Sequence, residues 1–274
     1  MKITFLGGGN MAIALIGGMI ERGFAAQDIQ VIELDADNRE RLHKRFGVRT
    51  TGLADAQALG CDVLMLAVKP QQMKAALAPL AGVLKDVLVI SIAAGLRLGD
   101  IGRWLGSAAA PYTRIVRCMP NTPALIGAGI TGLYADPSVD AAGKEAAGRI
   151  LAAVGSTVWI EDEAQMDGVT GVSGSGPAYV FHFIEALEAA GSAQGFDEAT
   201  ARKLAIDTVL GAARLAAGSE DAPSVLREKV TSKGGTTAAA LAHLAQAGWH
   251  DTLVAAVAAA ADRGRALGDE LGKD

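Results

Sequence analysis

The order of apolar and polar positions along the first 160 residues predicts buried strands separated by helices. Short apolar runs end at small or charged residues, and longer segments with helical periodicity follow most of them. The strands are expected at Ile3–Leu6, Gln30–Glu33, Val48–Thr50, Asp62–Val68, Val87–Ile92, Arg114–Met119, Ile130–Ala135 and Ser156–Ile160. Continuous apolar runs such as DVLMLAV suit parallel strands covered on both faces, so a mainly parallel, doubly wound α/β sheet is predicted.

The pattern changes at Glu161, after which only helical segments follow. A short helix is also expected earlier, over 53–59. Helices are expected over 164–172, 197–217 with Asp197 as the N-cap, 223–229, and from Thr236 to near the end of the chain. We therefore predict two domains, 1–161 with the sheet and 162–274 with helices only.

The turn after the first strand carries candidate chemistry. Gly7, Gly9 and Ala12 form G-x-G-x-x-A between a strand and a helix, which is a dinucleotide-binding fingerprint. Gly7 would permit the tight turn and Gly9 the approach of a pyrophosphate to backbone N–H groups. A glycine-rich turn that only packs closely is the alternative, and context favours the fingerprint because Glu33 ends the second strand about twenty residues later.

Glu33 lies where such folds place the acid that binds the adenosine ribose hydroxyls. A carboxylate there would repel a 2′-phosphate, so NADH is predicted over NADPH. Two alternatives stay open: Arg39 or Arg41 could still hold a phosphate, and Glu33 could be a solvated strand end.

Three further segments are candidates for ligand binding. Ala67–Pro70 and Ala93–Gly95 follow strands at the carboxyl edge of the sheet, and the small residues of the second leave room for a flat ring. TSKGGTT, residues 231–237, places two glycines before a helix. Its backbone N–H groups, with the hydroxyls of Ser232, Thr236 and Thr237, would hold a carboxylate; a well-capped helix start is the alternative.

Composition narrows the class of protein. The 274 residues carry a net charge of −5 without basic runs, which argues against nucleic acid or anionic membrane as a partner. Cys61 and Cys118 are too few for a disulfide framework or a metal cluster, so no metal is predicted and each is expected to be a small buried residue. The uncharged run Ile3–Ile20 holds glycines and an asparagine, unlike a secretory signal, and a soluble cytoplasmic protein is expected. A mean hydropathy of +0.28 favours apolar surface covered by a second subunit.

Six motifs occur in an order that identifies a family. They are FLGGGNMA at the start, LAVKPQ at 66–71, SIAAGL at 91–96, RCMPNTP at 117–123, VTGVSGSGPAYVF at 169–181 and VTSKGGTTAAAL at 230–241. In these motifs the chain resembles the pyrroline-5-carboxylate reductases over essentially its whole length. The resemblance implies an N-terminal Rossmann domain that binds NADH or NADPH. It also implies an all-α C-terminal domain for substrate and dimerisation, in a homodimer or a decamer.

The resemblance also implies site residues. The cofactor would contact Gly7, Gly8, Gly9, Asn10 and Met11 at the pyrophosphate, Glu33 at the ribose, and Ala67, Val68, Lys69, Pro70, Ala93, Ala94 and Gly95 on the nicotinamide side. The imino acid substrate would contact Glu163, Ser232, Gly235, Thr236 and Thr237. Three residues depart from the family pattern: Glu33 and Leu34 stand where many relatives carry residues that favour NADPH, and Lys229 stands where some relatives carry an Asn that touches the cofactor.

The implied reaction is reduction of the cyclic imine 1-pyrroline-5-carboxylate to L-proline, the last step of proline biosynthesis. The ring must lie against the nicotinamide with its nitrogen hydrogen-bonded, and Thr237 is the candidate catalytic donor. Two alternatives have different signatures. A β-hydroxyacid dehydrogenase would carry a lysine on the first long helix of the second domain, but none occurs between Lys144 and Lys203. A noncatalytic NAD(H) sensor would not need the TSKGGTT turn.

Overall fold

The structure is a computed structural model that describes residues 1–55 and 57–273. Two compact units divide the chain: Met1–Ser175 together with Ala259–Asp274, and Gly176–Ala258. The predicted domain boundary at residue 161 lies just after the last strand, and the first compact unit continues beyond it. Every strand in the described residues belongs to the first unit.

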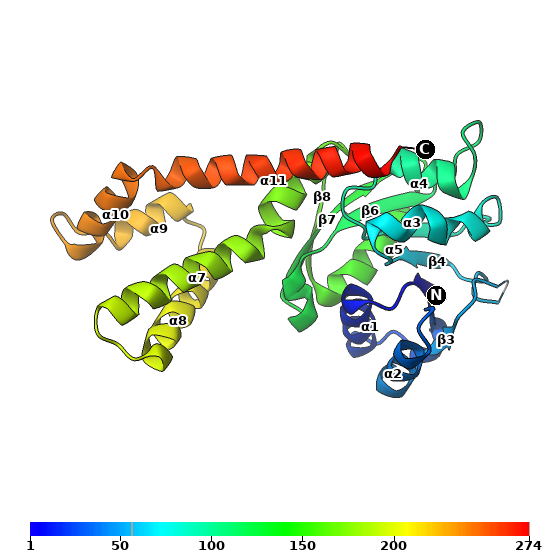
Figure 1. The fold of residues 1–274 in the computed structure, drawn as a ribbon, viewed down its shortest axis with the longest axis horizontal. Helices are drawn as coiled ribbons and strands as arrows, with labels where there is room; N and C mark the ends of the chain where they lie inside the picture. The colour runs from blue at the N-terminus through cyan, green and yellow to red at the C-terminus, as the bar shows by residue number, and fades with distance from the viewer. Residues whose placement is uncertain (56, 274) are drawn as a thin grey trace. The chain divides into compact units, whose positions relative to one another are not determined.

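The first unit contains one eight-stranded sheet in the order β3-β2-β1-β4-β5-β6-β7-β8 (Figure 1). Its strands are β1 (Ile3–Leu6), β2 (Ile29–Ile32), β3 (Arg49–Thr51), β4 (Val63–Leu66), β5 (Leu88–Ser91), β6 (Ile115–Met119), β7 (Gly129–Ala135) and β8 (Gly155–Trp159). The strand order runs outward in both directions from β1 and β4, which confirms the predicted doubly wound sheet.

One pair of neighbours is antiparallel. β7 runs against β6, with Met119 opposite Gly132, whereas all the other pairs are parallel. The connection from β6 holds only the short 3-10 turn Thr122–Ile126, which is too short for a parallel crossover. Helix α5 (Ala141–Leu151) then carries the chain to β8, which is parallel to β7 again.

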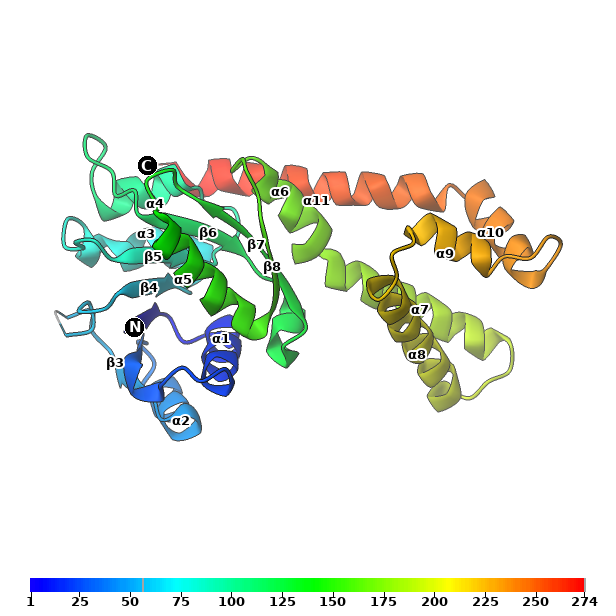
Figure 2. The ribbon, with the colours of Figure 1, turned by 180° about the vertical axis from the view of Figure 1, so that it is seen from behind.

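Alternate residues of the strands feed two separate cores. Ile3, Phe5 and Met65 belong to the core under α1 (Asn10–Glu21), α2 (Ala36–Phe46) and α5. Leu64 and Leu66 belong to the core under α3 (Pro70–Leu77) and α4 (Leu98–Leu105). Figure 2 shows α5 lying over its face of the sheet. Both faces are therefore covered, which explains the continuous apolar runs.

Aspartates that cap helices set several of the helix starts. The side chain of Asp35 accepts from Asp37 N at the start of α2, that of Asp140 from Gly143 N at α5, and that of Asp197 from Thr200 N at α8. The prediction that Asp197 is an N-cap is confirmed. Helix α8 spans Glu198–Ala217.

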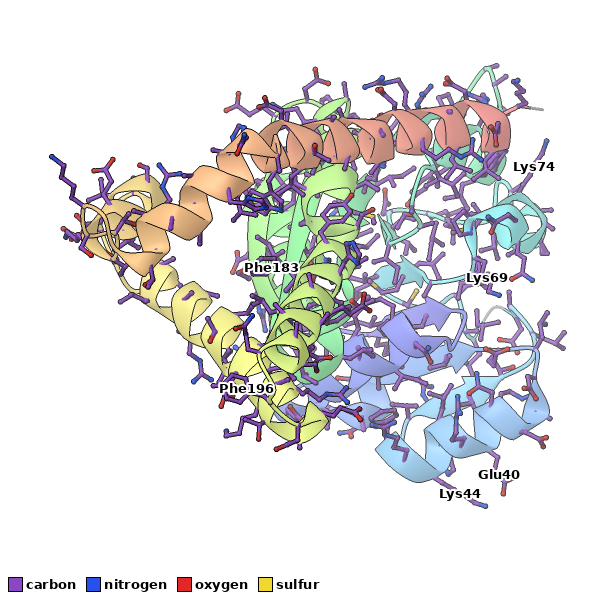
Figure 3. The ribbon with its side chains drawn as sticks, turned by 60° about the vertical axis from the view of Figure 1, so that its left-hand side comes forward. Glu40, Lys44, Lys69, Lys74, Phe183 and Phe196 are labelled. Atoms are coloured by element: carbon purple, nitrogen blue, oxygen red, sulfur yellow. The ribbon has the colours of Figure 1, made fainter. Side chains whose placement is uncertain are left out.

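The second unit is helical throughout its described residues. Its elements are α7 (Gly176–Ala193), α8, α9 (Pro223–Lys229), α10 (Thr236–Gln246) and the start of α11 (Trp249–Leu271), while α6 (Gln165–Val169) and the π-helical Thr170–Gly174 precede it. Phe183 and Phe196, labelled in Figure 3, belong to this unit and are 43% and 48% exposed. None of the helices in the described residues is long and apolar enough to cross a membrane.

Two helix predictions were wrong. The helix expected from Thr236 to the end is two helices, because Gly248 adopts φ +68° between α10 and α11. The helix expected over 53–59 is absent from its described residues, which form turns and bends; position 56 lies outside the described residues.

Candidate active site

The predicted cofactor residues gather at one edge of the sheet. The fingerprint follows β1, Glu33 follows β2, Ala67–Pro70 follows β4, and Ala93–Gly95 follows β5. These four strands are parallel neighbours, so their carboxyl ends lie side by side. This is the edge where doubly wound sheets bind ligands.

A cavity of about 890 Å³ opens at this edge. It is lined by Leu6, Gly7, Gly8, Gly9, Ile32, Glu33, Leu34, Asp35, Gly52, Leu53, Ala54, Asp55, Ala67, Val68, Lys69, Gln72, Ala75, Ala76 and Pro79. Leu34 and Leu53 are 84% and 72% exposed and give its wall an apolar surface suited to a flat base. Figure 3 labels Lys69, the cationic residue of the lining, before α3.

The fingerprint turn has the geometry of a phosphate-binding turn. Gly7 has φ +101°, and a Cβ there would lie 2.9 Å from Ala67 O, so only glycine fits. Gly9 is the N-cap of α1 in an extended conformation, and no side chain of the described residues caps this helix. A Cβ at Gly9 would meet no atom within 4 Å, so space lies beside the amides of the first turn. These features fit the pyrophosphate of a dinucleotide.

Glu33 is held in place by the same turn. Its Oε2 accepts from Gly8 N at 3.1 Å and from Asn38 Nδ2 at 3.0 Å, and its Oε1 accepts from Asp35 N at 3.0 Å. Asn38 was not predicted; a polar residue one turn into α2 gives little signal by itself.

The two nearby arginines, Arg39 and Arg41, donate hydrogen bonds to acceptors on the protein. Arg39 donates to the carbonyl oxygens of Glu33 and Leu34, both at 2.7 Å, and Arg41 donates to Asn38 Oδ1 at 2.7 Å. Their guanidinium groups therefore have partners on the protein at this edge of the cavity.

The TSKGGTT turn lies in the second compact unit and is far from the fingerprint in the sequence. Gly235 is the N-cap of α10 in an extended conformation, and within the described residues no side chain caps the helix. Gly235 N donates to Ser232 O at 3.0 Å, closing the turn, and Gly234 has φ +73°. Ser232 is exposed, and binding of an anion at the start of α10 stays a prediction.

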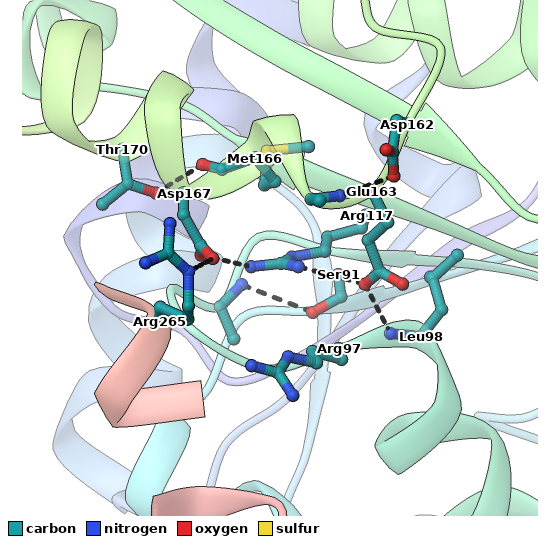
Figure 4. A network of polar contacts seen from close by, with 12 residues as sticks. Ser91, Arg97, Leu98, Arg117, Asp162, Glu163, Met166, Asp167, Thr170 and Arg265 are labelled. Carbon is teal, nitrogen blue, oxygen red and sulfur yellow. Dashed lines mark hydrogen bonds and ion pairs between the residues drawn. The ribbon is translucent and has the colours of Figure 1, made fainter. Parts of the chain in front are cut away.

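Glu163 lies in the first unit, in a network that includes the buried Arg117 (Figure 4). Its Oε1 accepts from Arg117 Nη1 at 3.0 Å and from Leu98 N at 2.8 Å. Arg117 Nη2 also lies 3.8 Å from Asp167 Oδ1, and Arg265 Nε lies 3.9 Å from Asp167 Oδ2. Arg117 was missed as a functional candidate, although one arginine inside the apolar strand IVRCM is a signal.

The predicted residues are therefore distributed as follows. Gly7, Gly8, Gly9, Glu33, Ala67, Val68 and Lys69 line the cavity. Asn10, Met11, Pro70, Ala93, Ala94 and Gly95 lie at the same edge but outside its lining, and Ser232, Gly235, Thr236 and Thr237 belong to the second unit. Cys118 is buried, which raises the pKa of its thiol, and Cys61 is half-buried.

Comparison with known proteins identifies the family. Residues 163–267 match a family described as pyrroline-5-carboxylate reductase dimerisation, and residues 2–95 match one described as NADP oxidoreductase coenzyme F420-dependent. A pyrroline-5-carboxylate reductase from Pseudomonas aeruginosa is 42% identical over 99% of this chain and 98% of its own length. The chain belongs to the pyrroline-5-carboxylate reductase family.

Solved structures of this family agree with the fold. A pyrroline-5-carboxylate reductase from Coxiella burnetii is 41% identical, with a TM-score of 0.91 over 97% of this chain and 98% of the other. A Plasmodium falciparum pyrroline carboxylate reductase solved with NADP bound is 29% identical, with a TM-score of 0.85 over 98% of both chains.

Proposed function

We propose that this chain reduces 1-pyrroline-5-carboxylate to L-proline with NAD(P)H, the last step of proline biosynthesis. Full-length similarity to pyrroline-5-carboxylate reductases carries this proposal. The two glycine turns, one beside a dinucleotide-sized cavity and one suited to a carboxylate, match the two ligands of the reaction. A β-hydroxyacid dehydrogenase is not supported, because such an enzyme would carry a lysine on the first long helix of the second domain, and none occurs between Lys144 and Lys203.

The chain's own residues would hold the cofactor, which supplies the hydride when bound. The amides at the start of α1 would bind the pyrophosphate, and Glu33 the ribose hydroxyls. Ala67–Pro70 and Ala93–Gly95, at the ends of the neighbouring strands, would border the nicotinamide side. The small side chains of Ala93–Gly95 would leave room for the ring.

We also propose that NADH is preferred over NADPH. The Glu33 carboxylate is fixed at the cavity by Gly8 N and Asn38, so a 2′-phosphate would meet a negative charge. Arg39 and Arg41, which could have offset that charge, donate to protein acceptors instead. The NADP named for the Plasmodium falciparum structure and for the family that residues 2–95 match argues the other way, so both cofactors need to be compared directly.

The substrate carboxylate would be bound by the TSKGGTT turn. Ser232, Gly235 and Thr236 would supply hydroxyl and amide donors at the N-terminus of α10, where the helix dipole favours an anion. Thr237, in the first turn of the same helix, would place its hydroxyl at the imine nitrogen, which becomes an amine and gains a proton as hydride arrives. Catalysis would then depend mainly on positioning.

A homo-oligomer, at least a dimer through the C-terminal helices, follows from the dimerisation family that residues 163–267 match. The second unit exposes large apolar side chains that a partner could cover. They include Phe181 at 58%, Phe183 at 43%, Phe196 at 48%, Leu215 at 60%, Trp249 at 47% and Val254 at 57% exposed. Sedimentation showing only monomer at micromolar concentration would contradict this.

The test is oxidation of NADH and NADPH by the purified protein with 1-pyrroline-5-carboxylate. Proline formed with NADH ahead of NADPH is the expected result. Turnover that favours NADPH would keep the reaction and overturn the preference. Cofactor binding with no turnover would overturn the reaction and favour a noncatalytic sensor.

A further inference from the structure

The loop between β5 and α4, residues 92–97, contains the proposed nicotinamide-side residues Ala93–Gly95. Within the first unit, two groups far away in the sequence hold this loop. Neither group contacts the cavity described above, so their role needs a separate explanation.

The first group fixes the end of the loop. Leu98 N, the first amide of α4, donates to Glu163 Oε1 at 2.8 Å, and Arg117 Nη1 donates to the same oxygen at 3.0 Å (Figure 4). The Arg117 side chain is only 4% exposed, so its charge is weakly screened and holds the carboxylate firmly. Glu163 therefore acts as the cap of α4 from 65 residues away.

The second group is the end of α11, which lies against the middle of the loop. A Cβ on the buried Gly268 would lie 2.6 Å from Gly95 O, so glycine is required for this approach. Gly95 itself has φ +80°. Arg97 Nη2 lies 2.7 Å from Asp269 Oδ1 and adds an ion pair next to the contact.

We propose that Glu163 and Gly268 are positioning residues that hold Ala93–Gly95 in place for the nicotinamide. This assigns Glu163 a role through the loop, in place of the direct substrate contact expected from family resemblance. Its Oε1 already has two donors, as a structural cap requires. The inference rests on the proposed function, since it assumes that the loop borders the cofactor.

Amide hydrogen exchange of the wild-type protein checks that assumption independently. Residues 92–98 should exchange more slowly when NADH or NADPH is bound without substrate. Unchanged exchange would show that the loop does not meet the cofactor, and would overturn the inference while leaving the reaction intact.

A glycine pair on α11 tests the second group with a matched control. Gly268→Ala places a methyl against Gly95 O and should weaken NADH binding about tenfold, with kcat reduced about tenfold by misplacement of the ring. Gly264→Ala, one turn earlier, would meet nothing closer than 3.8 Å and should leave both values unchanged. Equal NADH affinity and equal kcat in the two variants would contradict the proposal.

Glu163 variants separate positioning from substrate binding. Glu163→Ala should raise the dissociation constant of NADH, measured without substrate, about tenfold and speed exchange at 92–98, with KM for 1-pyrroline-5-carboxylate changed less than about twofold. Glu163→Gln keeps an oxygen for Leu98 N and should recover part of the loss. A raised substrate KM with unchanged NADH binding would instead show direct substrate contact, and a lowered Tm with neither change would show a purely structural role; both overturn the proposal.

Discussion

The fingerprint turn and the TSKGGTT turn use the same backbone arrangement in different chemical surroundings. Each places an extended glycine, Gly9 or Gly235, at the N-cap of a helix that no side chain in the described part of the chain caps. The first turn adjoins a buried sheet and the Glu33 carboxylate, whereas the second is flanked by hydroxyls and Lys233. Under the proposed function, each helix end would bind an anion and the neighbouring side chains would select which anion is accepted.

Three other helices begin differently. α2, α5 and α8 start with aspartates whose own side chains occupy the first amides. An aspartate at Gly9 or Gly235 would fill the position that a ligand needs. The two glycine N-caps therefore leave room for the ligands that we propose to bind there.

The largest expected effect concerns the Thr237 hydroxyl, which we propose to donate to the imine nitrogen. Thr237→Val keeps the side-chain shape but removes the donor, and kcat should fall about 100-fold while the dissociation constant of NADH stays unchanged. Thr237→Ser should restore much of the rate. As a control, Thr231→Val removes a hydroxyl that donates to Arg227 O and should leave kcat near wild type. Little loss in Thr237→Val would rule out the catalytic role.

The two glycine N-caps should separate the ligands. Gly9→Ala puts a methyl into the open space beside α1 and should raise KM for the cofactor about thirtyfold without lowering Tm. Gly235→Ala brings a Cβ against Ser232 Oγ and should raise KM for the substrate instead. Steady-state kinetics with each substrate varied in turn gives both values. If each variant changed both KM values equally, the two turns would not have separate ligands.

A smaller effect tests Glu33. Glu33→Gln removes the negative charge and should shift the ratio of kcat/KM for NADPH over NADH about tenfold toward NADPH. Glu40→Gln is the matched control, because it removes the same charge from an exposed carboxylate on α2. Glu40 pairs with Lys44 on the surface (Figure 3). An equal ratio in both variants would mean that Glu33 does not select the cofactor.

The smallest expected effect is the pH dependence of the stability that the Asp197 N-cap of α8 contributes. The N–H of Thr200, and then its hydroxyl, donate to Asp197 and lower the pKa of that carboxyl below its usual range. A carboxyl with a lowered pKa in the folded state stabilises the fold above its unfolded-state pKa, about 3.9, and this contribution is lost as pH falls through the folded value. Asp197→Asn does not titrate, so its Tm should fall less than that of wild type between about pH 5 and pH 2, by about 2 °C. Equal falls of Tm in the variant and in wild type would show that the ionised Asp197 cap does not contribute to stability.

Much of the fold could be predicted because its signals are local. β-strands, the fingerprint and the Asp197 cap depend on residues within one or two turns of each other. The break at Gly248 was missed because a single glycine in an alanine-rich segment does not fix its own φ. The antiparallel β7 was missed because strand direction depends on the connection and on which strand is available to pair.

The residues of the candidate site can be divided in the same way, into local motifs and long-range contacts. The two glycine turns and the acid after β2 could be found from the sequence, since each is a short motif whose backbone geometry follows from its residues. The contacts of Arg117 with Glu163, of Glu163 with Leu98 and of Gly268 with Gly95 could not. These contacts join residues from different elements with no fixed spacing, so they exist only once packing has brought those elements together.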